Sequence, residues 1–201
     1  MGLPKYEPMT DEEFMEWVAV QPGRYEFVNG YPLEMMAGAK QDHAVAASNI
    51  LTSLAPSAKN QGCRATGSDT YVLAGGNRRL PDVVVDCGPK DSNATHATGP
   101  TVVVEVLSDS SNAIDHTDKL DDYQSHPDIR VVLLVDPSHV SVKAYRRVDA
   151  TWVPERYEDL ADIIPLPEIS ASLALVDIYD TLDPKPRFKA IDLNPGSVPR
   201  M

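Results

Sequence analysis

Two acidic residues interrupt strongly apolar stretches of the sequence, and their types point to metal chemistry. Asp82 precedes three valines directly after a proline, and Glu105 lies inside the run Val-Val-Val-Glu-Val-Leu. Burial of an unpaired carboxylate in a strand is costly unless the group is protonated, ion-paired or bound to a cation. If the two strands are neighbours, both carboxylates can meet at one edge of the sheet, where a hard cation such as Mg²⁺ would relieve their repulsion. Asp82 and Glu105 are therefore candidate metal ligands.

Other polar residues are candidates for the same site. Lys119 lies in a segment expected to be helical, with Tyr123 four residues later, and its long stem could bring the ammonium back to the carboxylates. There it could orient water and stabilise phosphoryl charge, or it could be an ordinary surface lysine. Glu26 lies at a polar position of a short predicted strand in which apolar and polar residues alternate, and an exposed glutamate is the simpler interpretation there. His43 falls on the apolar face of a helix, where a core histidine is the simpler interpretation.

The elements that would position these residues follow an α/β order. Thr10 and Glu13 have the spacing of a capping box for a short helix over 10–19, and Asn29-Gly30 predicts a hairpin over 24–35, with Pro32 favouring an edge strand. Further along the chain we expect a helix over 42–55 capped by Asp42, strands over 69–74, 80–87 and 101–107, a helix over 114–126, a strand over 131–136 and a hairpin over 139–147 and 151–158. A helix that connects the strands over 101–107 and 131–136 would make these two strands parallel.

Charge narrows the classes of partner. The chain has 18 Lys and Arg residues against 30 Asp and Glu, for a formal net charge of −12. Such an excess disfavours tight, non-specific binding to a phosphate backbone. The basic pairs Arg78-Arg79 and Arg146-Arg147 are interpreted as solvated hairpin charge.

Composition also suggests the compartment and the domain organisation. No apolar run is long enough to span a membrane, and the N-terminal segment is acidic where a signal peptide would be basic, so we expect a cytoplasmic protein. Cys63 and Cys87 cannot make a disulfide framework or a four-ligand zinc site, and we expect both to be reduced. The chain reads as one domain over 1–180 with a Pro-rich polar tail over 181–201.

Six short motifs, in a fixed order, carry a family resemblance. They are Tyr25-Glu26-Phe27-Val28-Asn29-Gly30, His43, Pro81-Asp82-Val83-Val84-Val85, Val104-Glu105-Val106-Leu107-Ser108, Lys119-Leu120 with Tyr123, and Val135-Asp136-Pro137. Together they resemble the Uma family of bacterial restriction-endonuclease-like proteins, which is assigned to the PD-(D/E)XK nuclease superfamily. The resemblance covers roughly residues 10–180. It implies an αβββαβ core with a mixed sheet, plus an N-terminal helix-hairpin and a C-terminal β-hairpin.

The resemblance also implies roles for the matched residues. Asp82, Glu105 and the carbonyl of Val106 would hold Mg²⁺, with Mn²⁺ as the alternative, and Glu26 would be a third acid near the metal. The superfamily pattern places a lysine two residues after the second acid, where this chain has Leu107.

The lysine of the following helix takes over that role in the Uma pattern. It is matched here by Lys119, which would be the catalytic lysine, and His43 and Tyr123 would support the site from behind. Two hypotheses follow. The chain is a Mg²⁺-dependent nuclease that acts on DNA as a homodimer, or it is a catalytically inactive module of the same fold that binds or assembles. The acidic charge and Leu107 favour the second, and the intact acids and Lys119 favour the first.

Overall fold

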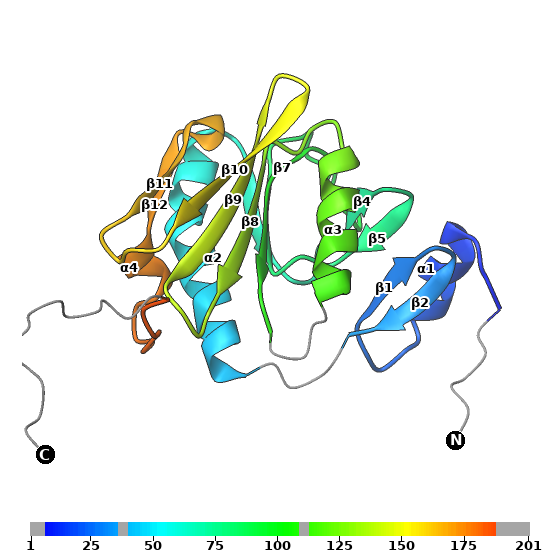
Figure 1. Ribbon diagram of the computed structural model, residues 1–201. Helices are drawn as coiled ribbons and strands as arrows, with labels where there is room; N and C mark the ends of the chain where they lie inside the picture. The colour runs from blue at the N-terminus through cyan, green and yellow to red at the C-terminus, as the bar shows by residue number, and fades with distance from the viewer. Residues whose placement is uncertain (1–6, 36–39, 109–112, 188–201) are drawn as a thin grey trace, which may run out of the picture.

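A six-stranded mixed sheet forms the centre of the molecule (Figure 1). The computed structural model describes residues 7–35, 40–108 and 113–187. The strand order is β10-β9-β8-β7-β6-β3, with the long helix α2 (Gln41–Asn60) against one face and α3 (Ala113–Ser125) against the other. The strands are β3 (Arg64–Gly67), β6 (Val83–Asp86), β7 (Pro100–Val106), β8 (Val131–Asp136), β9 (Ser141–Val148) and β10 (Thr151–Tyr157).

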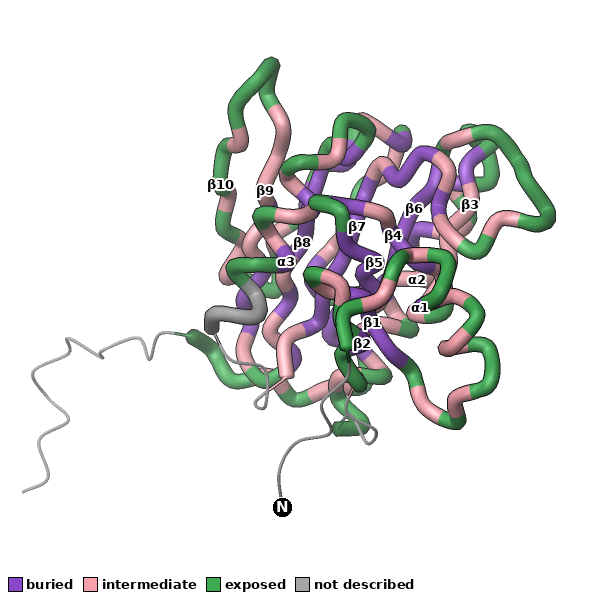
Figure 2. Tube along the Cα trace, turned by 90° about the vertical axis from the view of Figure 1, so that its right-hand side faces the viewer, coloured by how far each residue is buried: buried purple, intermediate pink, exposed green. Residues whose placement is uncertain are grey.

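The valine-rich strands are apolar on both faces because both faces are covered. Val83 and Val85 pack with Ile50 of α2, whereas Val84 packs with Tyr123 of α3 on the opposite side. Buried residues accordingly run along β6, β7 and β8 in the middle of the sheet (Figure 2). This double-sided burial explains why a carboxylate inside these strands is exceptional.

The crossover expected from the sequence is confirmed. β7 and β8 are parallel, with Glu105 beside Leu134, and α3 connects them, whereas β6 and β7 are antiparallel. The first core strand is β3, however, and not the segment over 69–74. That segment contributes β4 (Val72–Ala74) to a second sheet of order β2-β1-β5-β4, in which β5 spans Asn77–Arg79.

The N-terminal part forms the helix and hairpin that the sequence predicts. α1 (Asp11–Val18) begins with a capping box between Thr10 and Glu13. β1 (Tyr25–Val28) and β2 (Tyr31–Glu34) meet in a tight turn in which Asn29 and Gly30 adopt φ of 52° and 85°, as a type I′ turn requires. β2 lies at the edge of its sheet, where Pro32 costs no ladder hydrogen bond.

Three predicted details of this frame need correction. α2 runs from Gln41 through Pro56 to Asn60, and its N-cap is Lys40 and not Asp42. The basic pairs are not solvated, since Arg78 and Arg79 are buried. Arg146 forms ion pairs with Glu155 and Glu168, and Arg147 lies over the ring of Trp152.

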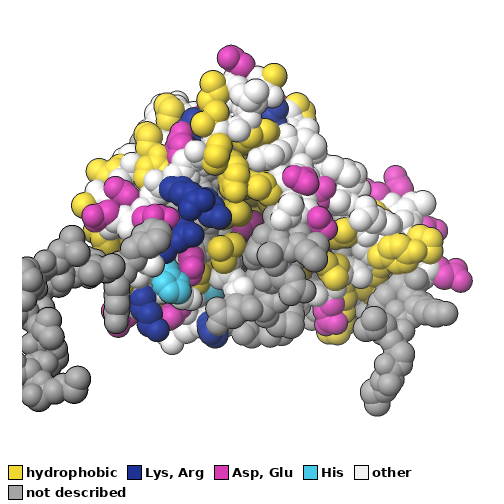
Figure 3. Space-filling view, in the orientation of Figure 1, with side chains coloured by type: hydrophobic (Ala, Val, Ile, Leu, Met, Phe, Trp, Pro, Cys, Tyr) yellow, Lys and Arg dark blue, Asp and Glu magenta, His cyan; other side chains and the backbone are white. Residues whose placement is uncertain are grey.

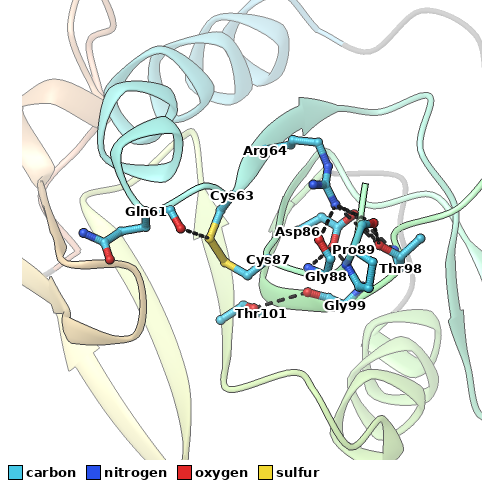
Figure 4. Close-up of a disulfide and its surroundings, with 10 residues drawn as sticks. All are labelled: Gln61, Cys63, Arg64, Asp86, Cys87, Gly88, Pro89, Thr98, Gly99 and Thr101. Carbon is cyan, nitrogen blue, oxygen red and sulfur yellow. Dashed lines mark hydrogen bonds and ion pairs between the residues drawn. A yellow bond between two sulfur atoms is a disulfide. The ribbon is translucent and has the colours of Figure 1, made fainter. Parts of the chain in front are cut away.

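The expectation that both cysteines are reduced is wrong in this structure. Cys63 and Cys87 form a disulfide, with Cα atoms 4.2 Å apart (Figure 4). The physical reason is register: Arg64 of β3 pairs with Asp86 of β6, so the residues just outside this pair face each other across the two antiparallel strands.

The C-terminal part completes the layer that carries α2. The predicted hairpin over 139–158 forms β9 and β10, which extend the large sheet. It is followed by β11 (Ile163–Leu166), the 3₁₀ turn Pro167–Ile169, β12 (Ala171–Ala174) and α4 (Leu175–Ile178). Of the predicted tail over 181–201, residues 188–201 lie outside the described part. Within the described part, none of the helices has the length and apolarity that a membrane span needs.

Candidate active site

The two acids singled out in the sequence meet where β6 begins and β7 ends. In the antiparallel ladder, Val83 pairs with Val104, and the same register one step further sets Asp82 opposite Glu105. Side chains at opposed positions share a face of the sheet. The Asp82 carboxylate turns back onto β7 and accepts a hydrogen bond from the backbone N–H of Val106 at 2.7 Å. The sheet thus brings Asp82, Glu105 and Val106 to one place.

Glu105 lies deep in this site. Its side chain is held from α3, where the hydroxyl of Tyr123 donates to Oε1 at 2.6 Å and the ammonium of Lys119 lies 3.5 Å from the same oxygen. Burial raises the pKa of Glu105 to about 7, with the charges of Asp82 and Glu26 adding to the rise and Lys119 and Tyr123 opposing it. The carboxyl group is therefore poised to change its protonation state near neutral pH.

Tyr123 stays protonated and acts as a donor. It is fully buried, and burial together with the neighbouring acids Glu105 and Glu26 raises its pKa well above the ordinary value of a phenol. The hydroxyl therefore holds the Glu105 carboxylate in one orientation.

Lys119 links the central sheet to the N-terminal hairpin. Its ammonium lies 2.9 Å from Oε1 of Glu26, a residue of β1 whose surface is only 1% exposed. The same oxygen of Glu26 accepts the backbone N–H of Leu80 at 3.0 Å. The interpretation of Glu26 as an exposed strand residue is wrong, because the second sheet packs β1 against the loop that leads into β6 and closes over the carboxylate.

Arg79 and Asp122 are polar partners of the site that the sequence did not reveal. The guanidinium of Arg79, 2% exposed, donates to Glu26 at 3.0 Å and to Asp122 of α3 at 2.7 Å. Burial lowers the pKa of Arg79, but the ion pairs with Glu26 and Asp122 outweigh it and leave the pKa above its ordinary value. Asn77 donates to the same oxygen of Asp122 at 2.8 Å. These contacts fix the distance between the hairpin and α3, and hence the position of Lys119 between them.

His43 approaches from the other side of the sheet. It lies in the first turn of α2, and its Nε2 is 3.3 Å from Oδ2 of Asp82. The interaction with Asp82 raises the pKa of His43, burial opposes the rise, and the backbone of Val106 supports it. The side chain is 16% exposed. His43 is thus a polar member of the site and not a core histidine.

The donor set matches what a magnesium ion accepts. Among the described residues, no three side chains of the types His, Cys, Asp and Glu gather closely enough to hold a metal ion by themselves. Two carboxylates and a carbonyl are nevertheless the hard oxygen donors that Mg²⁺ prefers, and Mg²⁺ is often bound through one or two carboxylates plus oxygens of a phosphate substrate. The oxygen atoms of Asp82, Glu105 and Val106 are thus of the type that could hold such a cation.

The residues named from the sequence for this site lie in two sets of contacts, which are joined by the peptide bond between Glu105 and Val106. The first set also includes the two residues that were missed, and its members are Glu26, Arg79, Glu105, Lys119, Asp122 and Tyr123. The second set consists of His43, Asp82 and Val106. Leu107, at the usual lysine position of the superfamily, continues from β7, and its N–H donates to the carbonyl of Val135 at 2.7 Å.

Comparison with known proteins shows the family to which this sequence is similar. Residues 11–176 match the family Uma2, described as "Putative restriction endonuclease". A protein of Synechocystis sp. strain PCC 6803, described only as uncharacterised, is 31% identical over 181 residues, which is 88% of this chain and 93% of the relative.

A solved structure shares the fold. The crystal structure of "a putative nuclease belonging to DUF820" from Anabaena variabilis superposes with a TM-score of 0.68 at 19% sequence identity, covering 85% of this chain and 97% of that chain.

Proposed function

The chain belongs to the Uma2 family, and from this membership we propose that it is a metal-dependent nuclease that hydrolyses phosphodiester bonds of DNA. The single observation that carries the proposal is the position of Lys119, whose ammonium lies between the buried carboxylates of Glu26 and Glu105. A lysine that only solubilised the surface would not be 8% exposed beside two acids.

Asp82, Glu105 and the carbonyl of Val106 would hold Mg²⁺, or Mn²⁺ in its place. When bound, the cation supplies positive charge beside the phosphate that is attacked. Oxygen donors and a divalent cation also explain why the sequence keeps two strand carboxylates that otherwise repel each other.

The protein's own residues supply positioning and protons. Tyr123 and Lys119 hold the Glu105 carboxylate through the same oxygen. The ammonium of Lys119, fixed by Glu26, can donate a hydrogen bond to a water or to a phosphoryl oxygen that enters the site, and it stabilises the negative charge that develops during hydrolysis. Arg79 holds Glu26 and Asp122 in place, so the ammonium does not have to be reordered for each turnover.

One observation favours a second function. The ammonium of Lys119 lies 3.5 Å from Glu105, and His43, whose pKa is raised by Asp82, lies 3.3 Å from the Asp82 carboxylate, so side chains of the protein already lie beside both proposed metal-binding carboxylates. A chain that has lost catalysis would look the same, and it would serve as a binding or assembly module of this fold.

Hydrolysis distinguishes the two functions. Purified protein is incubated with single-stranded, duplex and supercoiled DNA in Mg²⁺, in Mn²⁺ and in chelator, and the wild type is compared with Asp82→Ala. We expect cleavage by the wild type with either metal and none in chelator or with the variant. Equal background cleavage by both proteins under all conditions would leave the binding module as the function.

Metal binding has its own readout. A cation that binds only the folded state raises the melting temperature by mass action. We expect Mg²⁺ to raise the melting temperature of the wild type and not that of Glu105→Ala.

Because a duplex has two strands to cut, we further propose a homodimer, which sedimentation velocity would detect.

A further inference from the structure

A basic pocket lies beside the proposed active site, on the face of the large sheet that carries α3. It has a volume of about 340 Å³ and is lined by Leu107, Leu134, Asp136, His139, Ser141, Lys143 and Arg187. Figure 3 shows Lys, Arg and His side chains gathered on this face over β9 and β10. We call these seven residues the basic pocket.

The register of the strands connects the basic pocket to the active site. Glu105 of β7 pairs with Leu134 of β8, Leu134 pairs with Lys143 of β9, and Lys143 pairs with Arg156 of β10. Register partners point to the same face, so these four residues form one row across the sheet. Neighbouring strands are about 4.8 Å apart, which sets Lys143 roughly 10 Å from Glu105 along the row.

Lys143 is the residue of the basic pocket whose positive charge can pair with a bound anion. It is half-buried, and within the described part of the chain its side chain forms neither a hydrogen bond nor an ion pair. Arg187, by contrast, donates to the hydroxyl of Ser141 at 3.0 Å and to Glu158 at 2.8 Å. The basic pocket therefore holds one ammonium without an anion beside a guanidinium that is already fixed in direction.

The charged side chains around the pocket give it a small excess of positive charge, which favours binding of an anion. The cations are Lys143, Arg187 and, on the same row, Arg156, and the acids are Asp136, which contacts His139 at 3.2 Å, and Glu158, which is 3.9 Å from Arg156. This balance is positive by one charge with neutral histidine, in a chain whose formal net charge is −12. A local excess of positive charge on such a molecule marks a place where a phosphate can approach.

We propose that the basic pocket binds a phosphodiester group of the DNA strand, next to the bond that the active site cleaves. This inference rests on the proposed function, because the site beside the pocket is what makes a nucleic-acid strand the source of the phosphate. Because Lys143 lies roughly 10 Å from Glu105, a strand with one phosphate at the active site can place a nearby phosphate of the same strand at Lys143. Lys143 supplies the charge, and Arg187 and Ser141 supply further donors.

Binding in the absence of hydrolysis tests the pocket separately from catalysis. The affinity for a fluorescein-labelled DNA hairpin with a single-stranded tail is measured by anisotropy in chelator over a series of salt concentrations. We expect Lys143→Gln to raise Kd about tenfold at low salt and to reduce the slope of log affinity against log salt by about 0.7–0.9, as loss of one phosphate contact predicts. Lys143→Arg keeps the charge, and we expect it to retain the affinity.

Lys59→Gln is the matched control. It removes the same charge from an exposed position at the end of α2, on the opposite face of the sheet, and we expect Kd to change by less than about twofold. Inorganic phosphate is the second probe. If phosphate binding depends on Lys143 whereas DNA binding does not, the pocket serves a free anion and the proposal is overturned.

The remaining outcomes separate this inference from the proposed function. A wild type that does not bind the hairpin, or a Lys143→Gln variant that binds as tightly as the wild type, overturns the inference whether or not DNA is cleaved. A protein that binds through Lys143 and cleaves nothing supports the inference and overturns the proposed catalysis.

Discussion

The two ends of β6 each carry an aspartate that is largely withdrawn from solvent, and the two surroundings differ in kind. We call the end of β6 at the proposed active site, with Asp82, the near end, and the opposite end, with Asp86, the far end. At the far end, Asp86 accepts hydrogen bonds from the backbone N–H groups of Gly88 and Gly99, each at 2.8 Å, and of Thr98 at 3.1 Å. Arg64 adds an ion pair at 2.7 Å (Figure 4). Burial raises the pKa of Asp86, but Arg64 and the backbone donors outweigh burial and hold the pKa below its ordinary value.

The near end has no such balance. Asp82, Glu105 and Glu26 converge there. Lys119 is shared between Glu26 and Glu105, Arg79 is shared between Glu26 and Asp122, and Asp82 has His43 as its partner. The result is opposite to that at Asp86, since burial and the neighbouring acids raise the pKa of Glu105 to about 7.

The comparison shows that burial of a carboxylate does not by itself identify a functional site. Fixed backbone donors satisfy Asp86 and close the loop that precedes β7, which is a structural task. Buried carboxylates that repel one another lie side by side only where another interaction compensates the repulsion. Binding of a cation is the interaction that the chemistry suggests here. The partners of a buried acid are therefore more informative than its burial.

The largest effect should come from Asp82→Ala. Loss of a proposed metal ligand should reduce the rate of DNA hydrolysis in Mg²⁺ by about 10³-fold, measured as initial rates on a labelled oligonucleotide. Because the substitution also relieves repulsion with Glu105, the melting temperature should not fall by more than a few degrees. A variant with the wild-type rate would remove the near end of β6 from the catalytic machinery.

The matched change at the other end should act on stability. Asp86→Ala leaves three backbone N–H groups without their acceptor and removes the carboxylate that pairs with Arg64, and it should lower the free energy of unfolding by roughly 3 kcal/mol in urea titrations. The hydrolysis rate per folded molecule should stay at the wild-type level. Asp121→Ala, at an exposed position of α3, is the control and should stay within about 0.5 kcal/mol. A stable Asp86→Ala protein would abolish the contrast between the two ends.

Lys119→Met tests whether the shared cation does chemistry. The variant keeps the apolar stem and removes the ammonium between Glu26 and Glu105, and the hydrolysis rate should fall by about 10²-fold, as for the loss of one preorganised donor. The response of the melting temperature to Mg²⁺ should persist, since the metal-binding oxygens remain. Lys59→Met serves as the control on the opposite face. Wild-type hydrolysis by Lys119→Met would show that the lysine only balances charge.

The elements with strong periodicity could be predicted from the sequence, and so could the residues that lie on them. Runs of valine, a crossover helix and an Asn-Gly turn each have a local signal, and Asp82 and Glu105 are visible because they break an apolar pattern. Arg79 has no such signal. It lies on the three-residue strand β5, beside a second arginine and next to a turn, where exposed charge is the ordinary outcome.

Long-range pairing explains what else could not be predicted. The choice of β3 over β4 as the first core strand depends on which partner β6 finds, and Arg64–Gly67 carries no apolar alternation. The disulfide depends on the same pairing, because Cys63 and Cys87 come together only when β3 and β6 align. Asp122 contacts Arg79 across 43 residues of sequence, a distance at which spacing carries no information.

The smallest effect we expect is a difference in how the two ends of β6 respond to pH. In the folded protein the pKa of Glu105 is raised to about 7, and in the unfolded chain it returns to its ordinary value of 4.5. Between these values the folded state binds more protons, so the stabilisation is complete below about pH 4.5 and is lost as the pH rises through about 7. Asp86 has the opposite sign, because its lowered pKa stabilises the protein above its ordinary value of 3.8 and this stabilisation is lost as the pH falls.

Glu105→Gln isolates the contribution of the near end, because an amide keeps the shape of the protonated carboxyl group and cannot ionise. In chelator, the variant should match the wild type near pH 4.5 and exceed its free energy of unfolding by roughly 2 kcal/mol at pH 7–8. His43 is present in both proteins, and Asp82, the largest cause of its raised pKa, is unchanged; the charge of Glu105 adds a smaller part of that rise, which the variant removes. Urea titrations of the two proteins across this range give the measurement. A constant difference at all pH values would mean that Glu105 stays ionised throughout, and that Lys119 and Tyr123 satisfy it as completely as the backbone satisfies Asp86.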